Sequence, residues 1–181
     1  MTALDAVRRR RSHAAVSADA PTHEELLPLV AAAATVADHA ALHPWRLIEV
    51  RGSARERLGA AFVEASGLTG AEAEKLAAKP LRASLLLAVV ARRVPSFKVP
   101  DWEQDAAAAG VAHTLSLLLD EAGWGVMWRT GGLVRSEPVR RLHGLDATET
   151  LLGWLYVGGV IPDRVKPERE PIDPEDYLSV L

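Results

Sequence analysis

Two histidines and an acidic residue lie where a helical pattern gives way to an apolar segment. The stretch runs from Asp38 and His39 through His43, Pro44 and Trp45 into an apolar run. Three interpretations are open: metal ligands, acid–base groups, or structural and ligand-facing histidines. Pro44 cannot continue a helix and is expected to hold His43 extended, and no third ligand stands at a metal-site spacing. A metal site is therefore disfavoured, and the other two interpretations stay open.

A cluster of arginines, Arg8 to Arg11, is followed directly by Ser12. Guanidinium groups bind phosphate through paired hydrogen bonds, and a neighbouring hydroxyl adds a donor. Alternatively, the cations complement the negative carboxyl end of a helix predicted from Thr2 to about Arg10. These residues alone leave both interpretations open.

A third segment, Gly123 to Gly132, reads G-W-G-V-M-W-R-T-G-G. It contains neither the Walker phosphate-binding pattern nor the dinucleotide-binding glycine fingerprint. It is either a helix cap followed by a strand and a turn, or a backbone that a planar ligand can approach because glycine leaves room.

The composition excludes several classes of function. The chain has 181 residues, 49% hydrophobic and 25% charged, which predicts one domain over 1–181. The absence of cysteine excludes thiolate metal sites and disulfides, and a net charge of −3 argues against nucleic-acid partners. The amino terminus has no apolar core of signal-peptide length, and the longest apolar run, Leu85 to Ala91, is too short to span a membrane. We therefore expect a soluble cytoplasmic protein.

The elements that must position these residues follow from hydrophobic periodicity and helix caps. Helices are predicted over about 2–10, 22–36, 53–66, 69–80, 100–123 and 136–143, and strands over about 45–51, 84–93, 125–130 and 151–160. This order predicts an α+β fold with one sheet of four or five strands wrapped by helices. The proline-rich tail, 162–181, is expected to be extended and to pack on a partner subunit.

The predicted helix over 100–123 is rich in small residues, among them Ala106, Ala109 and Gly110. Small residues allow close packing of a neighbouring helix. This pattern is typical of a central helix in a dimer core, so we treat dimer formation as a hypothesis.

Taken together, these segments resemble the FMN-dependent nitroreductase family, and most closely its short, single-domain bacterial branch of NAD(P)H nitroreductases. The segments that carry the resemblance stand in the family's order: Arg10–Ser12, Asp38–Val50, Lys98–Gln104, Gly123–Gly131 and Leu152–Gly158.

The resemblance implies a nitroreductase-like fold with a mostly antiparallel sheet, assembled as a homodimer with one FMN in each of two interface sites. The early arginines and serine would hold the phosphate and ribityl end, and the aspartate–histidine segment would reach the flavin from the other chain. The cofactor-binding residues carried over are Arg10, Arg11, Ser12, Thr35, His39, Trp128, Arg129 and Thr130. No metal and no catalytic side chain is implied, because the flavin carries the chemistry.

The function implied is a ping-pong oxidoreductase. NADH or NADPH would donate a hydride to the flavin, and a nitroaromatic, quinone or similar small molecule would accept the reducing equivalents. The alternative is a flavin-binding or flavin-storage protein with little turnover, because His43 stands where larger relatives carry glutamine. Lys98 belongs to a matching segment, but no flavin contact is assigned to it.

Overall fold

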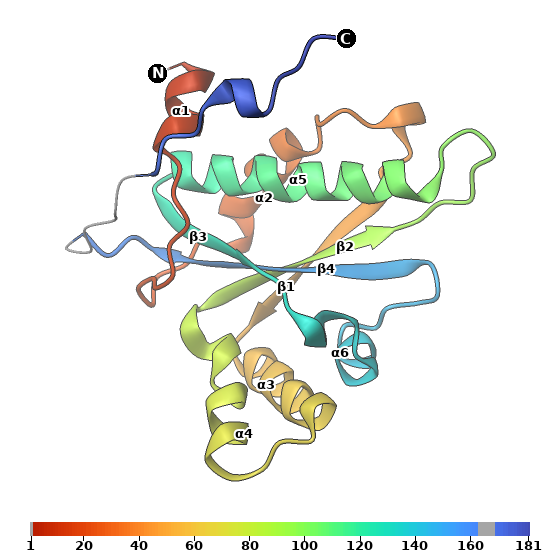
Figure 1. The fold of residues 1–181 in the computed structure, drawn as a ribbon. Coiled ribbons are helices and arrows are strands. Elements are labelled where there is room, and N and C mark those ends of the chain that lie inside the picture. Colours follow the sequence, from red (N-terminus) through yellow and green to blue (C-terminus); the bar gives the residue numbers. More distant parts are fainter. Residues whose placement is uncertain (1, 163–168) are drawn as a thin grey trace.

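The computed structural model describes residues 2–162 and 169–181 and places one antiparallel sheet between two layers of helices (Figure 1). The α-helices are α1 (Ala3–Arg9), α2 (His23–Ala33), α3 (Ser53–Ser66), α4 (Gly70–Ala77), α5 (Asp101–Glu121) and α6 (Glu137–Leu142). The 3-10 turns are η1 (His39–Ala41), η2 (Lys79–Arg82), η3 (Gly132–Arg135) and η4 (Pro174–Asp176). The strands are β1 (Trp45–Arg51), β2 (Leu85–Arg92), β3 (Trp124–Arg129) and β4 (Glu149–Gly159).

The strand order is β1-β2-β4-β3, and each neighbouring pair is antiparallel. Outside the named strands, Ser12 forms an isolated parallel bridge with Val126 at the free edge of β3. The predicted sheet of four or five mostly antiparallel strands is therefore confirmed, with four strands. The predicted boundaries of the four strands agree with the structure to within two residues.

Strand β2 is the centre of the fold because both of its faces are covered. Leu86, Ala88 and Val90 belong to the core beneath α3, α4 and α6. The alternating residues Leu85 and Leu87 belong to the opposite core, beneath α2 and α5. A strand buried on both faces has no polar face, which explains the unbroken apolar run in the sequence.

Two helices begin with the capping boxes that the sequence predicts. The side chains of Thr2 and Thr22 accept hydrogen bonds from Asp5 N and Glu25 N, and both carboxylates bond back to the cap backbone. Each cap satisfies amide groups that a helix amino terminus leaves without a partner. Residues before the first strand are thereby fixed into two short helices.

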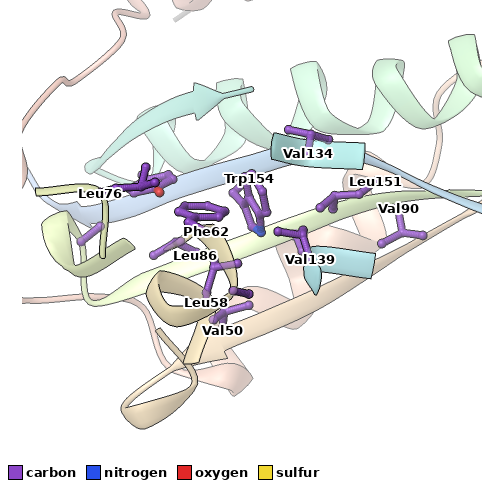
Figure 2. Packing of buried hydrophobic residues seen from close by; sticks show 14 residues of the cluster. Val50, Leu58, Phe62, Leu76, Leu86, Val90, Val134, Val139, Leu151 and Trp154 are labelled. Carbon is purple, nitrogen blue, oxygen red and sulfur yellow. The ribbon is translucent and has the colours of Figure 1, made fainter. Parts of the chain in front are cut away.

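Trp154 lies at the centre of the core on the α3 side of the sheet (Figure 2). Its ring meets Phe62 edge-on, with centroids 5.4 Å apart. The indole Nε1 donates to Nε2 of buried His143 at 3.1 Å, and Nδ1 of His143 lies 2.8 Å from the carbonyl of Val139. These contacts need a neutral imidazole that carries its proton on Nδ1, and burial lowers the pKa of His143 accordingly.

Two local expectations are wrong. His43 adopts a φ of +46° in place of extended backbone, because its N–H donates to Asp38 Oδ2 at 2.7 Å and closes a tight turn. The tail is not wholly extended, because η4 forms a 3-10 turn in which the Asp173 side chain accepts from Glu175 N. Part of the predicted tail, 163–168, lies outside the described residues.

The neutral state of His143 predicts a dependence of stability on pH. Below the ordinary histidine pKa of 6.5, His143 becomes protonated in the unfolded chain but stays neutral in the folded chain, because its folded pKa is lower. The free energy of unfolding should therefore fall as the pH drops below about 6.5. Urea unfolding at pH 7.5 and 5.5 should show a larger loss for the parent than for His143→Gln, which keeps hydrogen-bonding groups and cannot titrate. Equal losses in the two proteins would contradict this role of His143.

Candidate functional site

The arginine cluster lies at the carboxyl end of α1, and Arg10 and Arg11 make different hydrogen bonds there. Arg10 is the cap residue, and its N–H donates to the carbonyl of Ala6 at 3.0 Å. The guanidinium of Arg11 turns back, and its Nη1 donates to the carbonyl of Arg8 at 2.7 Å. Arg11 thus neutralises carbonyl groups at the helix end, as the structural interpretation of the sequence proposed. Its role toward phosphate stays a prediction.

The segment after α1 runs along the edge of β3 and joins two parts of the predicted site. His13 N donates to the carbonyl of Val126 at 2.9 Å, next to the bridge made by Ser12. Farther along, Arg129 Nη2 donates to the carbonyl of Ala14 at 3.0 Å. The fold therefore brings 10–12 and 128–130 to the same edge of the sheet.

Trp128 points from β3 toward α5, where its ring meets the ring of His113 edge-on at 5.2 Å. Gly153 on the neighbouring strand leaves room for the indole, since a Cβ there would lie 2.9 Å from Trp128 Nε1. That nitrogen is buried and finds no hydrogen-bond partner among the described residues. An indole N–H in this state lacks the partner that buried polar groups normally have.

Arg129 points to the opposite face of the sheet, where its guanidinium lies 5.1 Å from the ring centre of Tyr156. Its Nε is likewise buried and unpartnered within the described chain. Burial raises the pKa of the Tyr156 phenol, and the nearby cations of Arg129 and Arg82 oppose that rise. Tyr156 is therefore a neutral phenol among cations at neutral pH.

Beside this pair is a cavity of about 410 Å³. Its walls combine aromatic rings with cationic side chains: Phe62, Lys79, Arg82, Met127, Trp128, Arg129, Thr130, Trp154 and Tyr156. Within the described residues, none of the three cations forms an ion pair with a carboxylate. An aromatic floor with uncompensated positive charge suits a planar, electron-rich or anionic ligand.

Thr35 and His39 lie elsewhere in the same chain. Thr35 follows α2, and its hydroxyl donates to the carbonyl of Ala32 at 2.8 Å. His39 Nδ1 lies 2.7 Å from Glu103 Oε2, near the amino end of α5. The turn that carries His39 is strained, because Ala40 and Ala41 have φ values of +66° and +51°. In the described parts of the chain, no group of three or more histidine, aspartate or glutamate side chains could hold a metal ion.

The length of α5 separates His39 from the arginine cluster at the end of α1, which lies over one end of α5 (Figure 1). His39 is tied to Glu103 near one end, whereas Arg9 pairs with Glu121 at the other end, with Nη2 and Oε2 2.6 Å apart. Glu103 and Glu121 are 18 residues apart, which is about 27 Å along an α-helix. One chain therefore cannot bring His39 to its own Arg10 and Ser12.

Sequence reasoning missed Lys79 and Arg82, which lie directly before β2 and reach the cavity from η2. The signal in the sequence is weak: a K-P-L-R turn between a helix and a buried strand. It also missed Tyr156 and Trp154, because a strand that is apolar on both faces gives no indication of which residues border a cavity.

Comparison of the sequence with protein-family profiles identifies the family of the chain. The sequence profile described as "Nitroreductase family" matches residues 7–159. The chain belongs to the nitroreductase family. None of the helices in the described part of the chain is both long and apolar enough to cross a membrane.

Individual relatives agree with this assignment. The chain is 32% identical over 161 residues to "Putative NAD(P)H nitroreductase YdjA" of Escherichia coli K12, covering 87% of this chain and 88% of the relative. It is 30% identical over 190 residues to "Putative NAD(P)H nitroreductase" of Haemophilus influenzae, covering 100% of both.

Solved structures show the same fold. The nitroreductase-like family protein from Bacillus cereus superposes with a TM-score of 0.86 at 20% identity, covering 100% of this chain and 96% of that one. The FMN and NADPH-dependent nitroreductase NfnB from sphigopyxis sp. strain HMH gives a TM-score of 0.77 at 18% identity, covering 100% and 99%. The nitroreductase-like fold expected from the sequence is therefore confirmed.

Proposed function

We propose that the protein binds FMN and transfers reducing equivalents from NADH or NADPH to a nitroaromatic, quinone or similar acceptor by a ping-pong mechanism. One observation carries the proposal: 10–12 and 128–130, distant in sequence, meet at the edge of β3 beside a cavity with aromatic and cationic walls. The names of the relatives, NAD(P)H nitroreductases and an FMN-dependent nitroreductase, support the same cofactor and donor.

The donors present at this site suit a flavin. An isoalloxazine ring is planar and carries several carbonyl and nitrogen acceptors, and its side chain ends in a phosphate. Lys79, Arg82 and Arg129 line the cavity and carry N–H donors for such acceptors. Arg10 and Ser12 lie at the same edge of the sheet and supply charge and a hydroxyl for the phosphate.

The two segments would bind different parts of the flavin. Arg10, Arg11 and Ser12 would hold the phosphate and ribityl end, and 128–130 would hold the ring. The buried rings of Trp154 and Phe62 would exclude water from the inner wall of the cavity. When bound, the flavin supplies the capacity to take up a hydride and to pass electrons on, so no side chain of this chain must act as an acid or base.

The proposal includes a homodimer, because His39 lies near the far end of α5 from the arginine cluster. In a dimer that pairs the α5 helices in opposite directions, Thr35 and His39 of the partner subunit would reach the flavin of the first. The outer face of α5 supports this arrangement: Trp102 is 69% exposed, and Ala106 and His113 are also exposed. A helix with exposed small residues and an exposed indole is suited to pack against a second copy.

The first test is reduction of bound flavin. Purified protein incubated with FMN should retain a yellow colour after gel filtration, and NADH or NADPH under argon should bleach it rapidly. Adding a nitroaromatic or quinone acceptor should then restore the spectrum of oxidised flavin. A colour that persists with both nucleotides would favour the flavin-storage alternative. Colourless protein that FMN does not stabilise to heat would reject both.

The phosphate assignment predicts a loss of FMN affinity in Arg10→Ala. Removing one charge-assisted hydrogen bond costs about 1.5–3 kcal/mol, which weakens binding by roughly tenfold to 150-fold. Quenching of flavin fluorescence gives the dissociation constant. Arg8→Ala is the matched control, since it removes an exposed neighbouring arginine that is not assigned to the phosphate, and it should bind as the parent does. Unchanged affinity in Arg10→Ala would reject the assignment.

The dimer predicts that a charge on the outer face of α5 abolishes assembly and flavin binding together. At micromolar concentration the parent should sediment as a dimer of 19.5 kDa chains. Ala106→Arg should sediment as a folded monomer that has lost most of its FMN affinity, because its site lacks the partner subunit. Ala60→Arg makes the same change on an exposed position of α3 and should remain a dimer. A parent monomer that binds FMN would refute the shared site.

A further inference from the structure

We infer that Glu103 is a positioning residue for His39: its carboxylate holds the imidazole by Nδ1, so that Nε2 accepts a hydrogen bond from the flavin in the partner subunit's site. The inference rests on the proposed function, in which the turn of one chain reaches the flavin of the other. It assigns to Glu103 a role in flavin binding and to His39 a defined tautomer.

The contact between the two side chains decides which ring nitrogen carries the proton. Nδ1 of His39 lies 2.7 Å from Oε2 of Glu103. An ionised carboxylate can only accept hydrogen bonds, so Nδ1 must donate. In the neutral imidazole Nε2 is then an acceptor, and it forms no hydrogen bond to any described residue of the chain. Since 43% of the His39 side chain is exposed, a donor from outside the chain can reach the ring.

Glu103 stands on a rigid backbone at the amino end of α5. The next residue, Gln104, is buried and ties the loop before the helix to the helix itself. Its Oε1 accepts from Val94 N at 2.8 Å, and its Nε2 donates to the carbonyls of Val94 and Val99 at 2.9 and 3.3 Å. The carboxylate of Glu103 therefore cannot move far without breaking three hydrogen bonds of a buried side chain.

The turn that carries His39 is strained, as a turn shaped for a ligand often is. Three of its residues have φ values between +46° and +66°, although none of them is glycine. Asp38 holds this conformation, because its Oδ2 accepts from His43 N at 2.7 Å and its carbonyl accepts from Ala41 N at 3.1 Å. Backbone of this kind persists only where neighbouring contacts hold it, and it is found most often at ligand sites. The strain thus supports a turn that is kept in shape to present His39.

A histidine acceptor complements the cavity on the other chain. Oxidised FMN has hydrogen-bond donors as well as acceptors: the N–H group of ring N3 and the hydroxyl groups of the ribityl chain. Lysine, arginine and tryptophan side chains can only donate. Among the described side chains that line the cavity, only Thr130 and Tyr156 contain an oxygen that can accept. Nε2 of the partner subunit's His39 would supply a further acceptor for a flavin N–H or O–H group.

The first measurement reads the tautomer of His39 directly. The full-length protein is isotopically labelled at its histidine ring nitrogens, and long-range proton–nitrogen correlation spectra are recorded at about pH 8.5, where an ordinary histidine is neutral. Signals that disappear in His39→Ala identify the ring. The parent should carry its proton on Nδ1, and adding FMN should shift the Nε2 resonance. In Glu103→Leu the proton should move largely to Nε2, because the contact that favours Nδ1–H is lost. A proton on Nε2 in the parent would overturn the inference.

The second measurement is the affinity for oxidised FMN, from quenching of flavin fluorescence. Loss of one hydrogen bond between neutral groups should weaken binding about fivefold in His39→Ala, and Glu103→Leu should lose a similar factor. The double variant should bind no more weakly than His39→Ala alone. Glu103→Gln keeps an oxygen acceptor for Nδ1–H and should stay within about twofold of the parent. Losses that multiply in the double variant would show that Glu103 acts independently of His39, which contradicts a positioning role.

A control at the same end of α5 separates this role from a general loss of acidic charge. Asp101→Asn neutralises an exposed carboxylate that lies 3.4 Å from Arg93 and makes no contact with His39. It should bind FMN as the parent does and leave the tautomer of His39 unchanged. Sedimentation of every variant as a dimer shows that the shared site is still assembled.

The outcomes distinguish this inference from the proposed function. If the parent binds no FMN, the proposed function fails and the inference fails with it. If the parent binds FMN but the Nε2 resonance does not shift and Glu103→Leu keeps its affinity, the inference is overturned while the proposed function stands. With N3-methylated FMN, equal affinities of parent and His39→Ala assign the bond to the ring N–H, whereas a persisting difference assigns it to a ribityl hydroxyl. Either of these two results supports the inference.

Discussion

The stiffness of α5 is the constraint on which the arrangement of the site depends. An α-helix of 21 residues extends about 31 Å and cannot shorten without breaking its backbone hydrogen bonds. Its buried side packs on the sheet through Val111, Leu115 and Leu119, so the helix is also fixed in place. His39 and the end of α1 are attached near opposite ends of this helix. A second chain is the physical means by which they can meet.

The sheet positions the remaining residues of the proposed site. Its edge strand β3 is only six residues long, and it directs Trp128 to one face and Arg129 to the other. Because the first residues after α1 lie along that edge, a ligand bound there can contact both the arginine cluster and the end of the strand. The rigidity of β2 and β4, which are almost entirely buried, limits how far this geometry can relax.

The sequence was a good guide to elements and a partial guide to the site. Hydrophobic periodicity, capping boxes at Thr2 and Thr22, and a glycine after α5 located the helices and strands because these signals are local. The cavity is not a local feature: Lys79 and Arg82 reach it from η2, and Arg129 lies 47 residues beyond Arg82 in the sequence. The conformation of His43 depends on its hydrogen bonds to Asp38 and Trp45, which override the preference of a residue before proline. Periodicity contains no information about either contact.

The described carboxyl-terminal segment, 169–181, begins beside α1, where Arg169 Nη2 donates to the carbonyl of Arg10 (Figure 1). This proximity has a practical consequence for anyone who purifies the protein. An affinity tag on the amino terminus would be attached to α1, one short helix away from the arginine cluster, where a polyhistidine sequence would compete for anions. Cleavable tags, or a tag inserted in the exposed connection between α3 and α4, would keep recombinant material comparable with the untagged chain.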